Sequence, residues 1–334
     1  MSRHLINVPL NLLASPFIPA ARRVGASVRL HHDTLICSET GQKIPVVRGV
    51  PDCRLTDDGE ISGKKEGFER IYSSACRTGT VCDPVYLRQV EPLLRLIDAH
   101  CRDIPLAGPT LEVGCGMGVL AERLPGYVGL DYVMAILQAK GFEPFSRVCA
   151  SANDMPFQSG SFATVITNNA LEHVPEVHRA FAEIDRVLKP GGLLLFKMAW
   201  HCTTYNNLGI PNRPYADLPI RHKLTKALLP IIRSKPYKFL TRVPRRIGRR
   251  AFSRWPTALR YRVLSPSMEY YGLPDHDAYC DVDCHEGLMY FESRGYKCLT
   301  HLSYADKVLA GQDVLAFRKW TEQGVAKQAA ESLP

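Results

Sequence analysis

Short apolar runs alternate with amphipathic segments through the middle and the end of the chain. Residues 84–101 repeat apolar side chains at helical spacing, which predicts a helix. A second helix is expected at 285–293, with Gly295 as the residue that stops it. The apolar runs are short and bounded by glycine, proline or polar residues, which is typical of buried strands. They lie at 110–113, 127–132, 161–166, 193–198, 296–302 and 313–317. This alternation predicts an α/β fold with a mainly parallel sheet.

The first of these strands runs directly into a glycine-rich turn. The pattern is Glu112-x-Gly114-x-Gly116-x-Gly118, with Cys115 at one of the variable positions. Glycine is required where the backbone takes a positive φ or must approach a ligand closely. A dinucleotide fingerprint, G-x-G-x-x-G, would need glycine at position 119, which holds valine. The spacing therefore argues against a dinucleotide site.

The glycine turn resembles motif I of the class I S-adenosylmethionine (SAM)-dependent methyltransferases. Further segments are similar to motifs of that family and come in the family's order: ANDMPF at 152–157, ALEHV at 170–174 and RVLKPGG at 186–192. The resemblance implies a Rossmann-like seven-stranded sheet with SAM as the cofactor. SAM has no pyrophosphate, so the turn would pack against its methionine and ribose.

The resemblance also implies which residues bind the cofactor. Asp131 follows Gly114 by 17 residues, at the end of the second strand, where two carboxylate oxygens can bind both ribose hydroxyls. Two positions depart from the family pattern: Ser151 stands where an acidic residue often binds adenine, and Ala163 replaces the usual aspartate. The cofactor residues expected in full are Glu112, Gly114, Cys115, Gly116, Gly118, Asp131, Tyr132, Ser151, Ala152, Asn153, Asn168 and Asn169.

Two histidines are candidates for a catalytic base. Methyl transfer is an in-line displacement, and an oxygen acceptor also needs a group that removes its proton. His173 follows the fourth strand of the expected sheet, and His201 directly follows the fifth. Histidine suits this role near neutral pH. The alternative for His173 is that it and Glu172 only orient the next helix.

A dense group of acidic and histidine side chains lies near the end of the chain, at 275–277 and 281–286. Such oxygen donors can hold Mg²⁺ beside a diol. The alternative, which we prefer, is that Asp283 caps the helix 285–293 and its neighbours shape the acceptor cleft. We therefore expect no metal.

The positive charge of the chain is concentrated in one segment. Residues 218–268 hold 14 of the 42 Lys and Arg and no acidic residue, which leaves 28 basic against 33 acidic residues elsewhere. Within 221–262, basic, apolar and aromatic residues are interleaved, as in helices that lie on anionic membranes. This segment could instead bind a phosphorylated acceptor or RNA, or form a plain lid. We rank nucleic acid last, because no RNA-binding module accompanies the segment.

The amino-terminal part predicts a small β module. Residues 28–55 resemble the Trm112-like module that precedes many bacterial methyltransferase domains, but Thr40 stands where a second cysteine would be. We expect a metal-free remnant that serves packing. Residues 1–24 contain several prolines and predict a loop or short helix packed on the core or on a membrane. None of the 11 cysteines forms a C-x-x-C pair, and we expect free thiols in the cytoplasm.

The expected organisation has five parts. They are an amino-terminal segment with the β module (1–60), the SAM-binding core (61–200), a helical basic insert or lid (201–272), the completion of the core (273–320) and a tail (321–334). The expected function is O-methylation of a sugar or of a glycan- or lipid-linked acceptor, at the inner face of the membrane or free in the cytoplasm. The alternatives are methylation of a small aromatic or quinone-like metabolite, and a non-catalytic SAM-binding regulator.

Overall fold

The computed structural model describes residues 6–20, 23, 28–32, 34–54, 84–101, 108–139, 141–267, 269, 272–273 and 275–320. The expected linker at 55–84 and tail at 321–334 lie almost wholly outside the described residues. Within the described residues, no helix is both long and apolar enough to cross a membrane.

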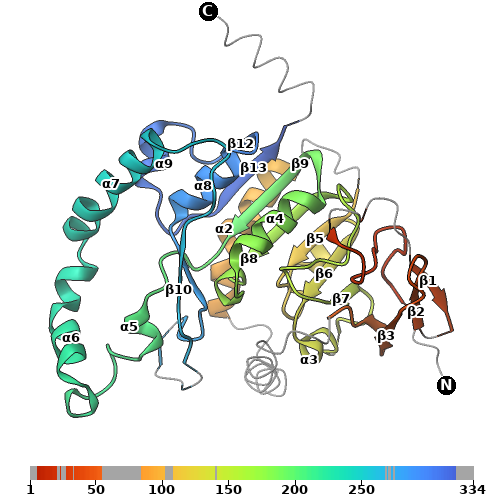
Figure 1. Cartoon of the computed structure of the whole chain (residues 1–334), viewed down its shortest axis with the longest axis horizontal. Coiled ribbons are helices and arrows are strands. Elements are labelled where there is room, and N and C mark those ends of the chain that lie inside the picture. Colours follow the sequence, from red (N-terminus) through yellow and green to blue (C-terminus); the bar gives the residue numbers. More distant parts are fainter. Residues whose placement is uncertain are drawn as a thin grey trace, which may run out of the picture.

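A seven-stranded sheet forms the centre of the molecule (Figure 1). Its order is β12-β13-β9-β8-β5-β6-β7, and β13 alone runs against its neighbours. This order confirms the expected Rossmann-like sheet of the class I methyltransferases. The strands are β5 (Thr110–Val113), β6 (Tyr127–Asp131), β7 (Ser146–Cys149), β8 (Phe162–Asn168), β9 (Leu188–Lys197), β12 (Tyr296–Cys298) and β13 (Leu315–Lys319).

Helices cover both faces of the sheet. Successive strand residues point to opposite faces, so Leu193 and Leu195 join one core cluster while Leu194 and Phe196 join the other. The first cluster packs against α2 (Pro84–Cys101) and α3 (Met134–Leu137), and the second against α4 (Val177–Val187) and α8 (Cys284–Glu292). The predicted helix at 84–101 is therefore confirmed.

The amino-terminal residues form a separate small sheet that lies beside β7. The four strands are antiparallel: β1 (Val28–His31), β2 (Thr34–Cys37), β3 (Lys43–Val47) and β4 (Val50–Pro51). The backbone N–H of Cys53 donates to the carbonyl of Cys149 at 2.8 Å, which joins this module to the edge of the main sheet. Val8, Leu12 and Leu13 are buried in the main core, so the first described residues pack on the core.

A long insert separates β9 from the end of the sheet. It contains α5 (Thr204–Asn207), α6 (Ile220–Arg233), α7 (Lys235–Ala251) and β10 (Tyr261–Val263), and it returns through β11 (Cys280–Val282). We call α6 and α7 together the arm. Figure 1 shows them end to end along one side of the molecule. The remaining short elements are η3 (Ala121–Arg123), η4 (Leu171–His173), η5 (Tyr215–Asp217) and α9 (Tyr304–Leu309).

Arginines of α7 attach the arm to α8. Arg246 is buried, and its guanidinium makes two hydrogen bonds to Asp283, at 2.6 and 3.2 Å. It also donates to the carbonyls of Val308 and Ala310. Asp283 caps α8 by accepting from the N–H of His285, as expected. These donors hold the pKa of Asp283 well below its usual range, against the opposing effect of burial.

Replacing Arg246 should destabilise the fold far more than replacing its neighbour. Arg246→Met leaves the Asp283 carboxylate buried without its two-pronged partner, and we expect a loss of about 3–5 kcal/mol in the free energy of unfolding. Arg245 donates to the same carboxylate at 2.8 Å, but its side chain is 66% exposed. Arg245→Met should therefore cost less than about 1 kcal/mol. Urea denaturation of both variants checks this, and equal losses would contradict it.

Candidate functional site

The turn after β5 needs its glycines for two different reasons. Gly114, Gly116 and Gly118 all have positive φ, between 51° and 72°. A Cβ on Gly114 would lie 2.2 Å from the Cβ of Ala170, and one on Gly118 would meet the ring of Phe142 at a similar distance. A Cβ on Gly116 would meet no described atom within 4 Å. Gly114 and Gly118 thus permit packing within the protein, whereas Gly116 borders open space.

Asp131 turns toward this glycine loop. Its Oδ2 accepts from the N–H of Gly116 at 2.9 Å, and its Oδ1 accepts from the N–H of Val133 at 3.0 Å. Burial raises the pKa of Asp131, and the backbone donors and the charge of His173 partly offset this effect. The carboxylate therefore lies at the carboxyl ends of β5 and β6, beside the open space at Gly116.

Glu112 braces the loop from within the core. It is buried, and its carboxylate accepts a hydrogen bond from the hydroxyl of Tyr127 at 2.6 Å. Burial raises the pKa of Glu112 to about 8, although the Tyr127 hydrogen bond lowers it. Cys115 is also buried, so it borders the loop through its backbone. These two predicted residues support the turn from behind.

The segment after β7 lies at the same edge of the sheet. Ser151 accepts from the N–H of Asn153 at 3.2 Å, and the Asn153 amide donates to the carbonyl of Pro175. Ala152 is buried. Arg54 lies over the ring of Tyr132, 5.7 Å from its centroid, and donates to the Tyr132 carbonyl. The amino-terminal module therefore contributes a cation beside Tyr132.

Unsatisfied polar groups mark the floor of the site. Asn168 ends β8 and is 7% exposed, yet neither atom of its amide has a hydrogen bond from the described residues. The Oδ1 of Asn153 and both carboxylate oxygens of Glu172 also lack hydrogen bonds within that part of the chain. Asn169, the next residue, has a φ of 48°, in the left-handed region. Buried amides without partners are uncommon, so these groups indicate a polar ligand.

His173 lies between two carboxylates. Its Nδ1 is 3.5 Å from Oδ2 of Asp277 and 3.4 Å from the Asp277 carbonyl, and its Nε2 is 3.7 Å from Glu172. Desolvation lowers the pKa of His173, but the charges of Glu172 and Asp277 outweigh it and the net shift is upward. His173 follows the carboxyl end of β8, which runs parallel to β5, so it lies at the same edge of the sheet as the glycine loop, and its charge lowers the pKa of Asp131.

The structure places His201 in a different environment. Its Nε2 is 3.8 Å from Asp283 and 3.4 Å from the guanidinium of Arg246, within the cluster that attaches the arm. Burial, together with the neighbouring arginines and against the charge of Asp283, lowers the pKa of His201 to about 4. Its φ of 66° is left-handed. The two predicted histidines are therefore not brought together, and His201 does not enter the mechanism below.

Sequence reasoning missed three residues near the site. Asp277 was expected to shape the acceptor cleft, but not to contact His173. Arg54 lies 78 residues before Tyr132, so only the folded chain shows that they meet. Lys197 ends β9, where burial lowers its pKa against the charge of Glu172. Lys197 was detectable, because it is a charged residue at the end of an otherwise apolar strand.

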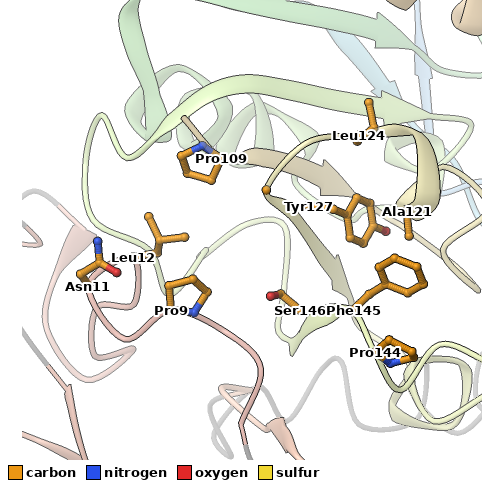
Figure 2. Close-up of a pocket in the computed structure, with 11 residues that line it drawn as sticks. Pro9, Asn11, Leu12, Pro109, Ala121, Leu124, Tyr127, Pro144, Phe145 and Ser146 are labelled. Atoms are coloured by element: carbon orange, nitrogen blue, oxygen red, sulfur yellow. The ribbon is translucent and has the colours of Figure 1, made fainter. Parts of the chain in front are cut away.

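A separate depression lies at the opposite edge of the sheet. It measures about 470 Å³ and is lined by Pro109, Tyr127 and Ser146, which lie at the amino ends of β5, β6 and β7 (Figure 2). Pro9 and Leu12 close one side. Since the glycine loop follows the carboxyl end of β5, this depression is not the cofactor site.

The geometry of the site is compatible with SAM as its ligand. Gly116 leaves room for a ligand against the backbone, Asp131 offers oxygens at the end of β6, and Asn168 presents an unpaired buried amide. Among the described residues, no group of three or more His, Cys, Asp or Glu side chains is arranged to hold a metal ion. Of the two acidic residues at 275–277, Asp277 contacts His173, and the charge of Asp275 also raises the pKa of that histidine.

Two glycine substitutions should separate folding from cofactor binding. Gly114→Ala forces its Cβ into Ala170, and we expect a loss of several kcal/mol in stability, about 3 or more. Gly116→Ala meets open space, so it should cost only about 1 kcal/mol for the left-handed φ. It should nevertheless weaken SAM binding at least tenfold, because its methyl group enters the ligand space. Thermal denaturation and calorimetry with SAM measure both effects; unchanged SAM affinity in the folded Gly116→Ala protein would contradict this assignment.

Comparison with known proteins places the site within a known domain. A family described as methyltransferase domain matches residues 111–196. The chain is 30% identical over 146 residues to malonyl-[acyl-carrier protein] O-methyltransferase of Methylovorus sp. (strain MP688), covering 38% of this chain and 49% of the relative. It is 34% identical over 123 residues to ubiquinone biosynthesis O-methyltransferase of Thiobacillus denitrificans, covering 33% and 52%.

A third relative has a different named activity. The mitochondrial arginine-hydroxylase NDUFAF5 of Mus musculus is 32% identical over 184 residues, covering 51% of this chain and 52% of the relative. The chain thus spans about half the length of these curated relatives.

The region matched by the methyltransferase family begins within β5 and ends within β9, so it contains the glycine loop, Asp131, Asn168 and His173. The chain therefore carries, at residues 111–196, the domain of a class I SAM-dependent methyltransferase, with SAM as its cofactor.

Proposed function

We propose that this protein transfers the methyl group of SAM to a hydroxyl of a sugar or a related acceptor that is carried on a lipid. The observation that carries the proposal is the pairing of His173 with Asp277 on the side of the sheet where Asp131 and Gly116 border the cofactor space. A hydroxyl is a weak nucleophile and needs a base, whereas an amine or thiolate acceptor would not need this pair.

The residues of the site divide the work. SAM, when bound, supplies an electrophilic methyl group on a sulfonium sulfur. The glycine loop, Asp131 and the floor at Asn168 would hold and orient it, with Tyr132, Ser151, Ala152, Asn153 and Asn169 along the same edge. With its proton on Nδ1, directed at Asp277, His173 keeps the lone pair of Nε2 for the proton of the acceptor hydroxyl. Glu172, 3.7 Å from Nε2, then stabilises the imidazolium.

The insert supplies the wall on the acceptor side. The buried amide of Asn207, in α5, donates to the carbonyls of His276 and Ala278 at 2.9 Å each. The N–H of Tyr279 donates to the carbonyl of Glu172 at 2.7 Å. These bonds hold Asp277 against His173. Because the same insert carries the arm with its exposed apolar residues, we propose that the acceptor is membrane-borne and that the enzyme works peripherally at the inner membrane face.

A second candidate is methylation of a small aromatic or quinone-like metabolite. It is favoured by the likeness to an enzyme named for ubiquinone biosynthesis, and His173 could serve a phenolic hydroxyl equally well. A non-catalytic SAM-binding protein is the third possibility, suggested by Ser151 and Ala163 in place of the family's usual acidic residues. A nucleic-acid substrate ranks last, because Arg246, Arg249 and Arg250 of the basic segment pair with carboxylates of α8.

Labelled SAM distinguishes these candidates. The purified full chain is incubated with methyl-labelled SAM and either a total lipid extract or a soluble metabolite extract. The proposal expects label in the lipid fraction that survives mild alkali, because a methyl ether is stable where a methyl ester is cleaved. Label in the soluble aromatic fraction alone would support the second candidate. SAM binding without transfer to any fraction would support the regulator.

The pH dependence of turnover should report on His173. Because its pKa is raised, the neutral base forms only above the ordinary value for histidine, so kcat/KM should rise with pH through that raised pKa. Asp277→Asn removes a negative charge that raises the pKa of His173, so the rising limb of the pH profile should move to lower pH.

His173→Gln should lower kcat by about 10²–10⁴ and leave SAM affinity within about threefold, since His173 is expected to face the acceptor. A His173→Gln enzyme with full turnover would exclude His173 as the base.

A further inference from the structure

The α7 helix presents its charged face inward and its apolar face outward. On the inward side, Arg249 binds both carboxylate oxygens of Glu286 and Arg250 pairs with Glu292, both on α8, alongside the bond from Arg246 to Asp283. These arginines were expected to face a membrane. The structure shows instead that they attach the arm to the acidic surface of α8.

The outward side of α7 is an apolar stripe. Tyr237, Leu240, Pro244, Ile247 and Ala251 follow one another at spacings of three and four residues, so they line one face of the helix. Tyr237, Leu240 and Ile247 are 40%, 70% and 43% exposed. At about 100° per residue, Leu240 and Arg249 lie on opposite sides of the helix. A helix at the surface of a soluble protein normally turns its apolar face toward the protein and its charged face toward solvent.

The α6 helix repeats this arrangement. Ile220, Leu224, Leu228 and Ile231 lie along one face and are 50% to 80% exposed. Leu229 lies on the opposite face, where it is buried against Ile210 and Leu218. Arg221 and Lys223 flank the exposed stripe, one on each side, as they would if their charged ends reached for lipid headgroups.

Each stripe lies opposite the side on which its helix packs against the protein, and we call the two stripes together the outer face of the arm. The helices meet at Ser234, which accepts from the N–H of Tyr237, and Figure 1 shows the two helices continuing one another. By helix geometry they are about 21 and 26 Å long. Phe252 and Trp255, which follow α7, are 90% and 53% exposed. An apolar surface of this extent is uncommon on a protein that works alone in water.

The positive charge of the insert indicates what binds to the outer face of the arm. Residues 218–268 contain no Asp or Glu, and exposed cations, among them Arg221, Lys235 and Arg254, accompany the apolar stripes. An apolar helix face with basic edges and aromatic residues is the composition of helices that lie in the plane of an anionic bilayer. We propose that the outer face of the arm docks on an anionic phospholipid membrane. This inference rests on the part of the proposed function that places the enzyme at a membrane, and not on the chemistry.

Docking here would bring the membrane close to the acceptor wall. Arg233, at the end of α6, donates to the side chain of Asn206 at 3.1 Å, and the adjacent Asn207 holds the carbonyls of His276 and Ala278. The arm is therefore connected through α5 to the segment that carries Asp277. A lipid-linked acceptor would reach the site along the surface to which the arm is bound.

Vesicle binding by the full chain tests the proposal. Flotation is measured with phosphatidylcholine vesicles, with and without phosphatidylglycerol. The triple variant Leu224→Gln/Leu228→Gln/Leu240→Gln removes apolar contact but keeps good helix formers and all charges. Leu30→Gln/Val47→Gln/Leu302→Gln is the matched control, because these residues are also exposed but lie outside the arm. We expect binding that requires the anionic lipid, a loss on the order of tenfold or more in the arm variant, and none in the control.

Three outcomes would overturn the proposal. They are no binding of the unmodified protein to anionic vesicles, equal binding by the arm variant, and an equal loss in the control. Light scattering adds a fourth: a dimer that becomes a monomer in the arm variant, with no vesicle binding, would make the outer face a self-association surface. Methyl transfer from labelled SAM to a detergent-dispersed total lipid extract is measured separately, so failure of docking and failure of the chemistry are distinguishable.

Discussion

The site depends on one close contact between two turns at the edge of the sheet. Gly114 follows β5 and Ala170 follows β8, and a side chain on Gly114 would overlap the methyl group of Ala170. Because residues 171–173 follow at once, this contact sets the position of His173 relative to the loop that would hold the cofactor. Parallel strands place their carboxyl ends together, but only a residue without Cβ lets these two turns touch.

The arm is held by a different physical principle. Its attachment uses buried, two-pronged contacts between guanidinium and carboxylate groups, in which both partners keep hydrogen bonds after leaving water. Such contacts need one particular geometry, so they orient α7 as well as hold it. Because the charged face of α7 packs against α8, its apolar face is left exposed to solvent or to a binding partner. The sequence of α7 therefore accounts both for the attachment of its charged face to α8 and for the exposure of its apolar face.

The sequence predicted the core well, because its signals are local. The strand at 110–113 begins and ends as expected from its apolar run and the glycine turn that follows it. The seven-stranded sheet was expected from the resemblance of short, ordered motifs to those of the class I methyltransferases, and each of these motifs is local. In β9 the strand begins at Leu188 rather than 193, because Leu188 already pairs with Phe162; the register then shifts across residues 189–192 before Leu193 pairs with Thr164. The contact between His173 and Asp277 joins residues 104 positions apart, and no local pattern reports it.

The arm shows a second limit of sequence reasoning. Periodicity shows that a helix has a charged face and an apolar face, but not which of them meets the protein. The arginines of α7 suggested a membrane because their partners, Asp283, Glu286 and Glu292, lie more than thirty residues further along the chain. The same distance explains why His173 and His201 looked equivalent: both follow strands at one edge of the sheet, and the later segments decide which one meets Asp277 and which meets Arg246. Because those segments lie beyond residue 196, likeness to the methyltransferase domain reaches the cofactor residues and stops short of the insert that would select the acceptor.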